Sequence, residues 1–376
     1  MKVVIAIDSL KGSLTSMEAG NAAREAVLSV HPDAEVIVRP LADGGEGTTD
    51  ALIEGLHGER ISLTVRGPLG DSVNCCYGLL RDTDTAVMEM AAAAGITLLP
   101  DGVKDPLHAG TYGVGEMIRH AIDGGCREFI VGIGGSATND GGIGMLKALG
   151  FEFYDRDGRD AGEGGAALGK VASIGTANRL PALDACHFRV ACDVTNPLCG
   201  ENGATFVYGP QKGVTEDMKY RLDSDMQHYA SVVRDTVGKD FSCTPGAGAA
   251  GGMGFAFLSF LNAELTPGID LCLDAVGLEN DIRDADIVIT GEGQLDLQTA
   301  MGKVPVGVAR LAKKYHAKVL AFAGSVTREA SACNDEGIDA FFPILRRICT
   351  LEEAMNKENA RQNMIDTVAQ VFRLFS

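Results

Sequence analysis

Acidic and hydroxyl side chains lie in three of four glycine-rich segments, and each of the four stands next to an expected strand or helix. The segments are residues 42–48, 132–142, 245–254 and 290–296. Glycine leaves backbone N–H groups open to a ligand, and a following helix adds positive potential at its start. One such segment is most simply a tight turn. Four together predict a site that handles phosphate groups.

Phosphoryl transfer needs cations for the phosphates, carboxylates for Mg²⁺, and a group that orients or deprotonates the attacking hydroxyl. Asp193 follows an expected strand at 188–192, and we expect it to be the general base or a Mg²⁺ ligand. Asp296 is the alternative for both roles. Lys11 follows the first expected strand and is a candidate for a phosphate or a carboxylate, or else a solvated surface lysine.

Other candidates for binding phosphate or substrate come from the same loops. Asp43 and Glu46 are three residues apart, so they either face one ligand or cap the following helix. Ser136 lacks the context of a nucleophilic serine, so we interpret it, with Thr138, as an anion-binding hydroxyl. The remaining candidates are Gly134, Gly135, Asn139, Asn196, Gly246, Gly248, Gly291, Glu292 and Lys303.

Two familiar nucleotide motifs do not explain these loops. Residues 246–251 match the glycine spacing of a dinucleotide site, but residues 239–245 before them do not form an expected buried strand. A Walker P-loop is absent, since Gly302-Lys303 is followed by Val304. A kinase with this sequence must therefore hold its nucleotide in another way. The scattered histidines argue against catalytic zinc.

Composition excludes several classes of protein. With 33 basic and 51 acidic residues the chain carries a formal charge of −18, which repels nucleic acids and anionic membranes. The ten cysteines include no C-x-x-C pair, which favours reduced thiols in the cytoplasm. We find no targeting segment, and the apolar part of the uncharged stretch 241–263 is too short to span a membrane. We expect a soluble protein.

The order of the expected elements predicts an α/β fold. This order and the length of 376 residues both predict two domains. Strands at 3–7 and 36–38, with a helix at 15–29 that begins in a capping box, open a parallel, Rossmann-like sheet domain over residues 1–60 plus 267–376. A second α/β domain, residues 61–266, is inserted and begins with an antiparallel meander. The other expected elements are a helix at 48–56, strands at 61–66, 73–80, 86–90, 129–131, 287–289, 319–322 and 341–344, and helices at 304–315 and 351–375.

Six blocks, in order along the chain, resemble those of the bacterial glycerate kinase family, type 1. They are Asp8-Ser9-Leu10-Lys11-Gly12-Ser13-Leu14, residues 42–48, residues 134–142, Cys192-Asp193-Val194-Thr195-Asn196-Pro197-Leu198, residues 245–254, and residues 290–296 continuing to Gly302-Lys303-Val304-Pro305. Leu10 stands where an aromatic residue is expected.

The resemblance implies that ATP, with Mg²⁺ as cofactor, phosphorylates D-glycerate at its 2-hydroxyl. It also implies that the active site lies in the cleft between two α/β domains. The substrate comes from the family alone. A kinase for another short hydroxy or sugar acid, and a binding module for nucleotides or anions without catalysis, remain alternatives. The sequence makes no prediction of the oligomeric state.

Overall fold

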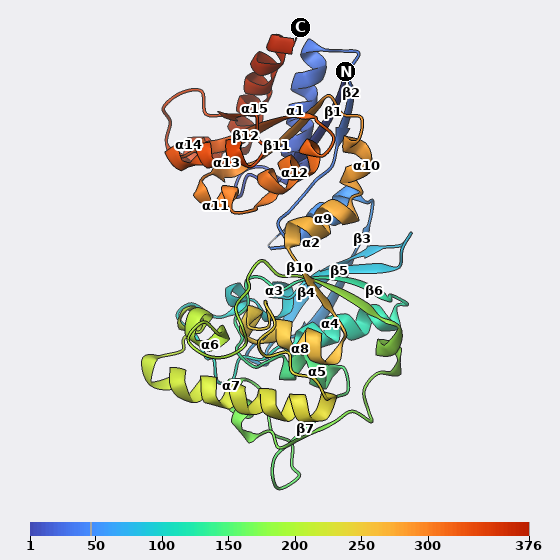
Figure 1. Cartoon of the computed structure of the whole chain (residues 1–376), viewed down its shortest axis with the longest axis vertical. Helices are drawn as coiled ribbons and strands as arrows, with labels where there is room; N and C mark the ends of the chain where they lie inside the picture. The colour runs from blue at the N-terminus through green and yellow to red at the C-terminus, as the bar shows by residue number, and fades with distance from the viewer. Residues whose placement is uncertain (46, 376) are drawn as a thin grey trace. The chain divides into compact units, whose positions relative to one another are not determined.

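The computed structural model describes residues 1–45 and 47–375, and the chain divides into two compact units (Figure 1). Unit 1 comprises Met1–Asp43, Asp50–His57 and Ile269–Ser376, and unit 2 comprises Gly44–Thr49 and Gly58–Gly268. Gly44–Thr49, which the sequence analysis assigned to the first domain, group with unit 2. The domain boundaries expected from the sequence, 1–60 plus 267–376 and 61–266, stay a prediction.

Unit 1 is built around a five-stranded parallel sheet in the order β13-β12-β11-β1-β2. Residues from both ends of the chain form this sheet, as expected. The apolar run of β1 is buried, as expected for an interior strand with neighbours on both sides. The strands are β1 (Lys2–Ile7), β2 (Glu35–Val38), β11 (Ile287–Leu295), β12 (Lys318–Val326) and β13 (Ala340–Pro343).

Helices pack against the strands of this sheet (Figure 1). The longest, α1 (Ser16–Val30) and α15 (Lys357–Phe372), pack against each other and share a core with the strands. The expected capping box is confirmed, because Thr15 Oγ1 accepts from Glu18 N–H and Glu18 Oε2 accepts from Thr15 N–H. The other helices include α2 (Thr48–Gly55), α9 (Gly268–Ala275), α10 (Leu278–Ile282), α11 (Leu297–Ala300), α12 (Val304–Lys313) and α13 (Ala332–Asp335).

Two elements of unit 1 differ from the prediction. The terminal helix is not continuous: α14 (Leu351–Met355) ends at Asn356, whose side chain accepts from Asn359 N–H and caps α15. The strand expected to end at 289 continues to Leu295 and pairs with β12. Its glycines had indicated a loop, but a Cβ at Gly291 would overlap the Phe322 carbonyl. Gly291 therefore allows β11 and β12 to approach closely.

Unit 2 contains a six-stranded mixed sheet in the order β10-β9-β6-β5-β4-β3. The expected antiparallel meander is confirmed in β3, β4 and β5, and the other neighbours pair in parallel. These observations confirm the predicted α/β class. The strands are β3 (Glu59–Arg66), β4 (Ser72–Leu80), β5 (Thr85–Glu89), β6 (Glu128–Gly132), β9 (His187–Ala191) and β10 (Glu264–Thr266).

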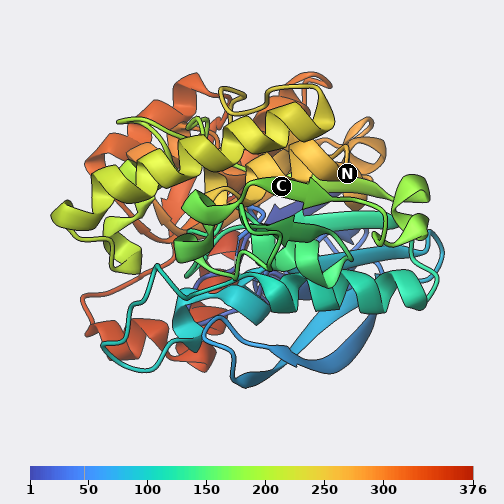
Figure 2. The same cartoon turned by 90° about the horizontal axis from the view of Figure 1, so that it is seen from below.

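Helices and a two-stranded antiparallel sheet complete unit 2, with the long helix α7 in yellow in Figure 2. Helix α7 packs against α6, α8 and the strand β8 of this small sheet. The apolar stretch after residue 252 forms α8, and no helix in the described part of the chain is both long and apolar enough to span a bilayer. The elements are α3 (Ala91–Ala94), α4 (Tyr112–Asp123), α5 (Ile143–Ala148), α6 (Ala204–Tyr208), α7 (Glu216–Val237), α8 (Met253–Phe260), β7 (Glu152–Tyr154) and β8 (Ser173–Gly175).

Candidate functional site

The strand order of unit 1 defines a point where ligands of open α/β sheets commonly bind. From β1 the chain continues outward to β2, whereas β11 continues in the other direction to β12 and β13. The carboxyl ends of the neighbours β1 and β11 therefore form a topological switch point. The Asp8 N–H donates to the Gly291 carbonyl oxygen at 2.9 Å, so the two strand ends are joined there.

Three carboxylates interact at this switch point. Asp8 is only 7% exposed, and burial together with the negative charge of Asp43 raises its pKa to about 7. The Ser9 N–H, 2.6 Å from Asp8 Oδ1, and the charge of Lys11 lower this pKa, while Glu292 adds to the repulsion. A set of mutually repelling carboxylates is an environment that a bound cation would stabilise.

Glu292 is held in place by neighbours from the segment after β11. Burial raises its pKa, and the Thr299 hydroxyl opposes this by donating to Glu292 Oε1 at 2.6 Å. Lys303 Nζ lies 3.9 Å from the other Glu292 oxygen. Asp296 caps α11, with its Oδ1 accepting from Thr299 N–H at 3.1 Å. This carboxylate therefore has a structural task, and its catalytic role stays a prediction.

The structure thus places several sequence-predicted residues at one edge of unit 1, namely Lys11, Asp43, Gly291, Glu292, Asp296 and Lys303. Glu46 lies outside the described residues. The sequence analysis missed Asp8, although it stands in the first block of the family resemblance. Its signal was available: a carboxylate directly after a buried strand points into the switch point of a parallel sheet.

In unit 2 the glycine-rich segment after β6 divides into an exposed and a buried part. Gly134 and Gly135 are exposed, whereas Ser136 is buried and Thr138 and Asn139 are completely so. Asn139 Nδ2 donates to Thr205 Oγ1 at 3.1 Å. Among the described residues, Thr138 Oγ1 and Asn139 Oδ1 have no hydrogen-bond partner. The exposed glycines are therefore the part of this segment that presents backbone to solvent.

A buried lysine and a buried aspartate hold this segment in place. Lys212 is 1% exposed, and its Nζ donates to the Thr138 carbonyl oxygen at 2.7 Å. Burial lowers the pKa of Lys212 to about 7, opposed by the charge of Asp140. Asp140 Oδ2 accepts from Thr111 N–H, Thr111 Oγ1 and Gly144 N–H, and its Oδ1 accepts from Gly142 N–H. Asp140 thus joins the starts of α4 and α5.

We expect Asp140→Asn to lower the stability of unit 2. Four donors converge on the two Asp140 oxygens at 2.7–3.2 Å, so an amide nitrogen in place of one oxygen would face a donor. The cost should be about 1–3 kcal/mol. In a thermal melt this is a decrease in Tm of several degrees. Exposed Asp123→Asn is the control and should leave Tm nearly unchanged. Equal Tm values for the two variants would contradict this structural role.

Asp193 and its neighbours lie in the segment that follows β9. Asp193 is exposed, and its Oδ1 accepts from Gly268 N–H at 2.9 Å. Asn196 is less available, because its Nδ2 donates to the Asn202 carbonyl and its Oδ1 accepts from Tyr208 OH at 2.7 Å. Asp193 is therefore the exposed carboxylate of this segment, and its catalytic role stays a prediction.

The segment 245–254 packs closely in the interior of unit 2. A Cβ at Gly246 would lie 2.9 Å from Cys192 Sγ, and one at Gly248 would overlap the Pro197 carbonyl. Both glycines are buried. Residues 239–245 form no strand, so the dinucleotide interpretation has no structural support. Close packing explains these two glycines, and their role in binding stays a prediction.

The carboxylates of unit 1 could hold a metal only together with other ligands. Within the described residues no three or more His, Cys, Asp or Glu side chains converge as metal ligands. Mg²⁺ commonly uses only one or two carboxylates and takes its other ligands from substrate phosphates and water. The carboxylates of unit 1 fit that mode of binding, because they are hard oxygen donors whose mutual repulsion a divalent cation would relieve.

Comparison with known proteins identifies the family. The sequence profile of the glycerate kinase family matches residues 3–376. The chain belongs to the glycerate kinase family. The resemblance that the sequence analysis found is thereby confirmed, and so is the expectation of an enzyme of the kinase class.

Named relatives of this glycerate kinase family are similar over nearly the full length. The chain is 46% identical to the glycerate 2-kinase of Escherichia coli strain K12, covering 98% of both chains. It is 46% identical to the glycerate kinase of Bacillus subtilis strain 168, covering 99% of this chain and 97% of the relative. A solved structure of a candidate glycerate kinase 2 from Salmonella typhimurium LT2 matches with a TM-score of 0.92 and 46% identity, covering 100% of this chain and 98% of that one.

Proposed function

We propose that this chain transfers the γ-phosphoryl group of ATP to the 2-hydroxyl of D-glycerate, giving 2-phosphoglycerate and ADP. The observation that carries the proposal is the family match over residues 3–376, with 46% identity to a glycerate 2-kinase over nearly the whole chain. The carboxylate and lysine groups at the switch point of unit 1 are the groups that phosphoryl transfer requires. The ten cysteines include no C-x-x-C pair, which favours reduced thiols, and we infer a cytoplasmic enzyme.

Unit 1 supplies the groups that bind the phosphates of ATP. Asp8 and Glu292, with Asp43 beside them, would hold Mg²⁺, which shields the negative charge of the phosphates during transfer. Lys11 and Lys303 supply positive charge next to these carboxylates. In a chain with a net charge of −18, such local cations are needed to attract an anionic nucleotide.

Unit 2 supplies groups for the acceptor. The exposed Gly134 and Gly135 can donate backbone N–H groups to a carboxylate or phosphate. Asp193 would orient the attacking hydroxyl and accept its proton, because it is a solvent-accessible carboxylate fixed through one oxygen by the Gly268 N–H. Asp193 and Asp296 also remain proposed Mg²⁺ ligands, one in each unit.

The proposed activity predicts that ADP is released only when ATP, Mg²⁺ and D-glycerate are all present. A coupled ADP assay with each component omitted in turn measures this, and EDTA should stop the reaction. Phosphorus NMR of the product separates the 2-phosphate from the 3-phosphate of glycerate. A panel of other short hydroxy and sugar acids under the same conditions tests the acceptor. No turnover of D-glycerate above background would overturn the proposal, and a preferred acceptor other than D-glycerate would correct its substrate.

A further inference from the structure

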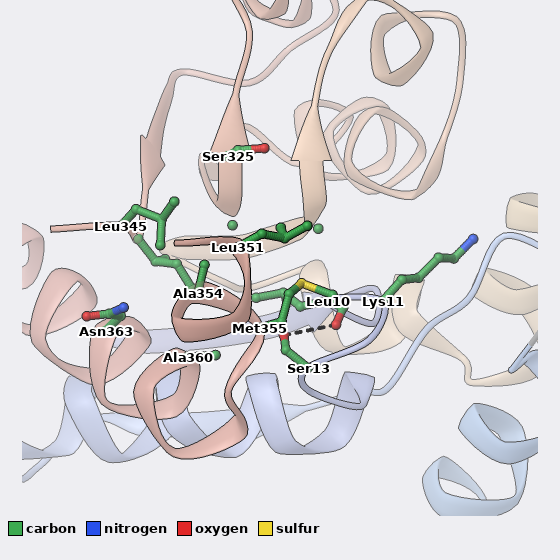
Figure 3. A pocket seen from close by; sticks show the side chains of 13 residues that line it. Leu10, Lys11, Ser13, Ser325, Leu345, Leu351, Ala354, Met355, Ala360 and Asn363 are labelled. Atoms are coloured by element: carbon green, nitrogen blue, oxygen red, sulfur yellow. Dashed lines mark hydrogen bonds between the residues drawn. The ribbon is translucent and has the colours of Figure 1, made fainter. Parts of the chain in front are cut away.

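Unit 1 contains a cavity at the edge of its sheet where the parallel strands end (Figure 3). The volume within it is about 110 Å³, and it opens to solvent at its mouth. The loop after β1, the ends of β11 and β12 and the segment after β13 form one side of the cavity, and α14 with the start of α15 covers the other. The cavity therefore lies beside the switch point between β1 and β11.

Aliphatic side chains dominate the lining, as Figure 3 shows for Leu10, Leu345, Leu351, Ala354 and Met355. Leu351, on α14, is 77% exposed, so a flat apolar ligand in the cavity would remove costly apolar surface from water. The methyl group of Met355 occupies the space that a Cβ at Gly12 would fill. This contact joins α14 to the loop after β1 and keeps the cavity formed.

Three polar side chains besides Lys11 belong to the lining, and one of them, Ser13, donates its hydroxyl to the Leu10 carbonyl oxygen at 3.0 Å. Asn363, from α15, brings a side-chain amide to one side, and Ser325 brings a hydroxyl near the end of β12 (Figure 3). An amide offers two donors and an acceptor, which suits the polar edge of a heteroaromatic ring. An apolar slot with a few polar groups is the usual composition of such a site.

The loop after β1 connects the cavity to the charged groups at the switch point. Lys11 belongs to the lining, but its side chain points away from the aliphatic side chains in Figure 3. Its charge acts on Asp8, which follows the same strand. A ligand that fits both places has a flat, weakly polar ring at one end and negative charges at the other. Nucleotides have this form.

We propose that this cavity binds the adenine base of ATP, with the phosphates continuing past Lys11 to the carboxylates at the ends of β1 and β11. The inference rests on the proposed function, because that function supplies ATP as the phosphoryl donor. It adds the position of the base, and it assigns nucleotide binding to unit 1. Binding of the base in this cavity forms no covalent bond.

Two variants test the cavity directly. Leu351→Ser removes an exposed aliphatic side chain from the lining, and Ala354→Phe fills the cavity. Each should weaken MgATP binding by about tenfold in calorimetry and raise the KM for ATP similarly, while the KM for glycerate changes little. Leu374→Ser is a matched control, because Leu374 is 78% exposed, belongs to the same unit and is not part of the lining. It should bind MgATP as the wild type does.

Inorganic tripolyphosphate is the second probe, since it carries the charges of ATP without a base. Leu351→Ser and wild type should bind it equally. Turnover with an unchanged ATP affinity in both cavity variants would overturn the cavity proposal and leave the proposed function intact. MgATP binding that depends on Leu351, without phosphorylation of any acid, would support the cavity and overturn the proposed function. Equal weakening of ATP and tripolyphosphate would overturn the assignment of the base.

Discussion

Asp8→Asn should reduce kcat/KM by about 10²-fold or more and at the same time raise the thermal stability of the protein. Asp8 is one of the carboxylates that would hold Mg²⁺, and removing one preorganised charged group from a phosphoryl-transfer site typically costs about 10²–10³ in rate. The variant should also need more Mg²⁺ for half-maximal activity. Steady-state kinetics with varied Mg²⁺ measures both effects.

The expected gain in stability follows from the pKa of Asp8. This pKa is raised from its ordinary value of 3.8 to about 7, so above pH 7 the folded protein carries a buried charge that is unfavourable. The difference corresponds to a destabilisation of at most about 4 kcal/mol, present above pH 7 and lost as the pH falls toward 4. In EDTA, Asp8→Asn should therefore raise Tm more at pH 8 than at pH 5.

Asp33→Asn is the control for this prediction, because it removes the same charge from an exposed turn of unit 1. It should change neither the rate nor the pH dependence of Tm. A structural role for Asp8 would lower rate and stability together. An Asp8→Asn variant that loses both would therefore contradict the assignment of Asp8 to the functional site.

Much of the fold could be predicted because its signals are local. The apolar run of β1 and the capping box at Thr15 are complete within a few residues, and both elements form where expected. The extent of β11 could not be predicted in this way. Gly291 favours a loop when only its own segment is considered, but it is required by the Phe322 carbonyl of the neighbouring strand. Close contacts between distant segments leave no local signal.

The candidate site also has features with a local sequence signal and features without one. The placement of Asp43, Glu292 and Lys303 at one edge of unit 1 could be predicted, because segments at the carboxyl ends of parallel strands meet at one edge of the sheet, and their roles stay predictions. Thr138 was expected to bind an anion, but the structure buries it with its carbonyl accepting from Lys212. Lysine is a surface residue in most proteins, and Lys212 lies 74 positions away from Thr138, so nothing in either segment indicates this contact.

Asp193→Asn should reduce turnover by about 10²–10⁴ while the KM for glycerate changes little, because a group that acts mainly in the transition state affects rate more than ground-state binding. Asparagine keeps an oxygen that can accept from the Gly268 N–H, so the segment after β9 should keep its conformation. Steady-state kinetics with varied glycerate, and a Tm equal to that of the wild type, test this expectation.

Asp296→Asn should be measured alongside Asp193→Asn, because Asp296 is the alternative catalytic carboxylate. Asparagine is also a good residue at the start of a helix, so this variant should preserve the cap of α11. If Asp193 binds Mg²⁺ instead of accepting a proton, high Mg²⁺ should partly restore its asparagine variant, and ATP binding should weaken as well. A proton acceptor cannot be replaced by more metal. Near-normal turnover in Asp193→Asn together with loss of turnover in Asp296→Asn would transfer the chemistry from the segment after β9 to the end of β11.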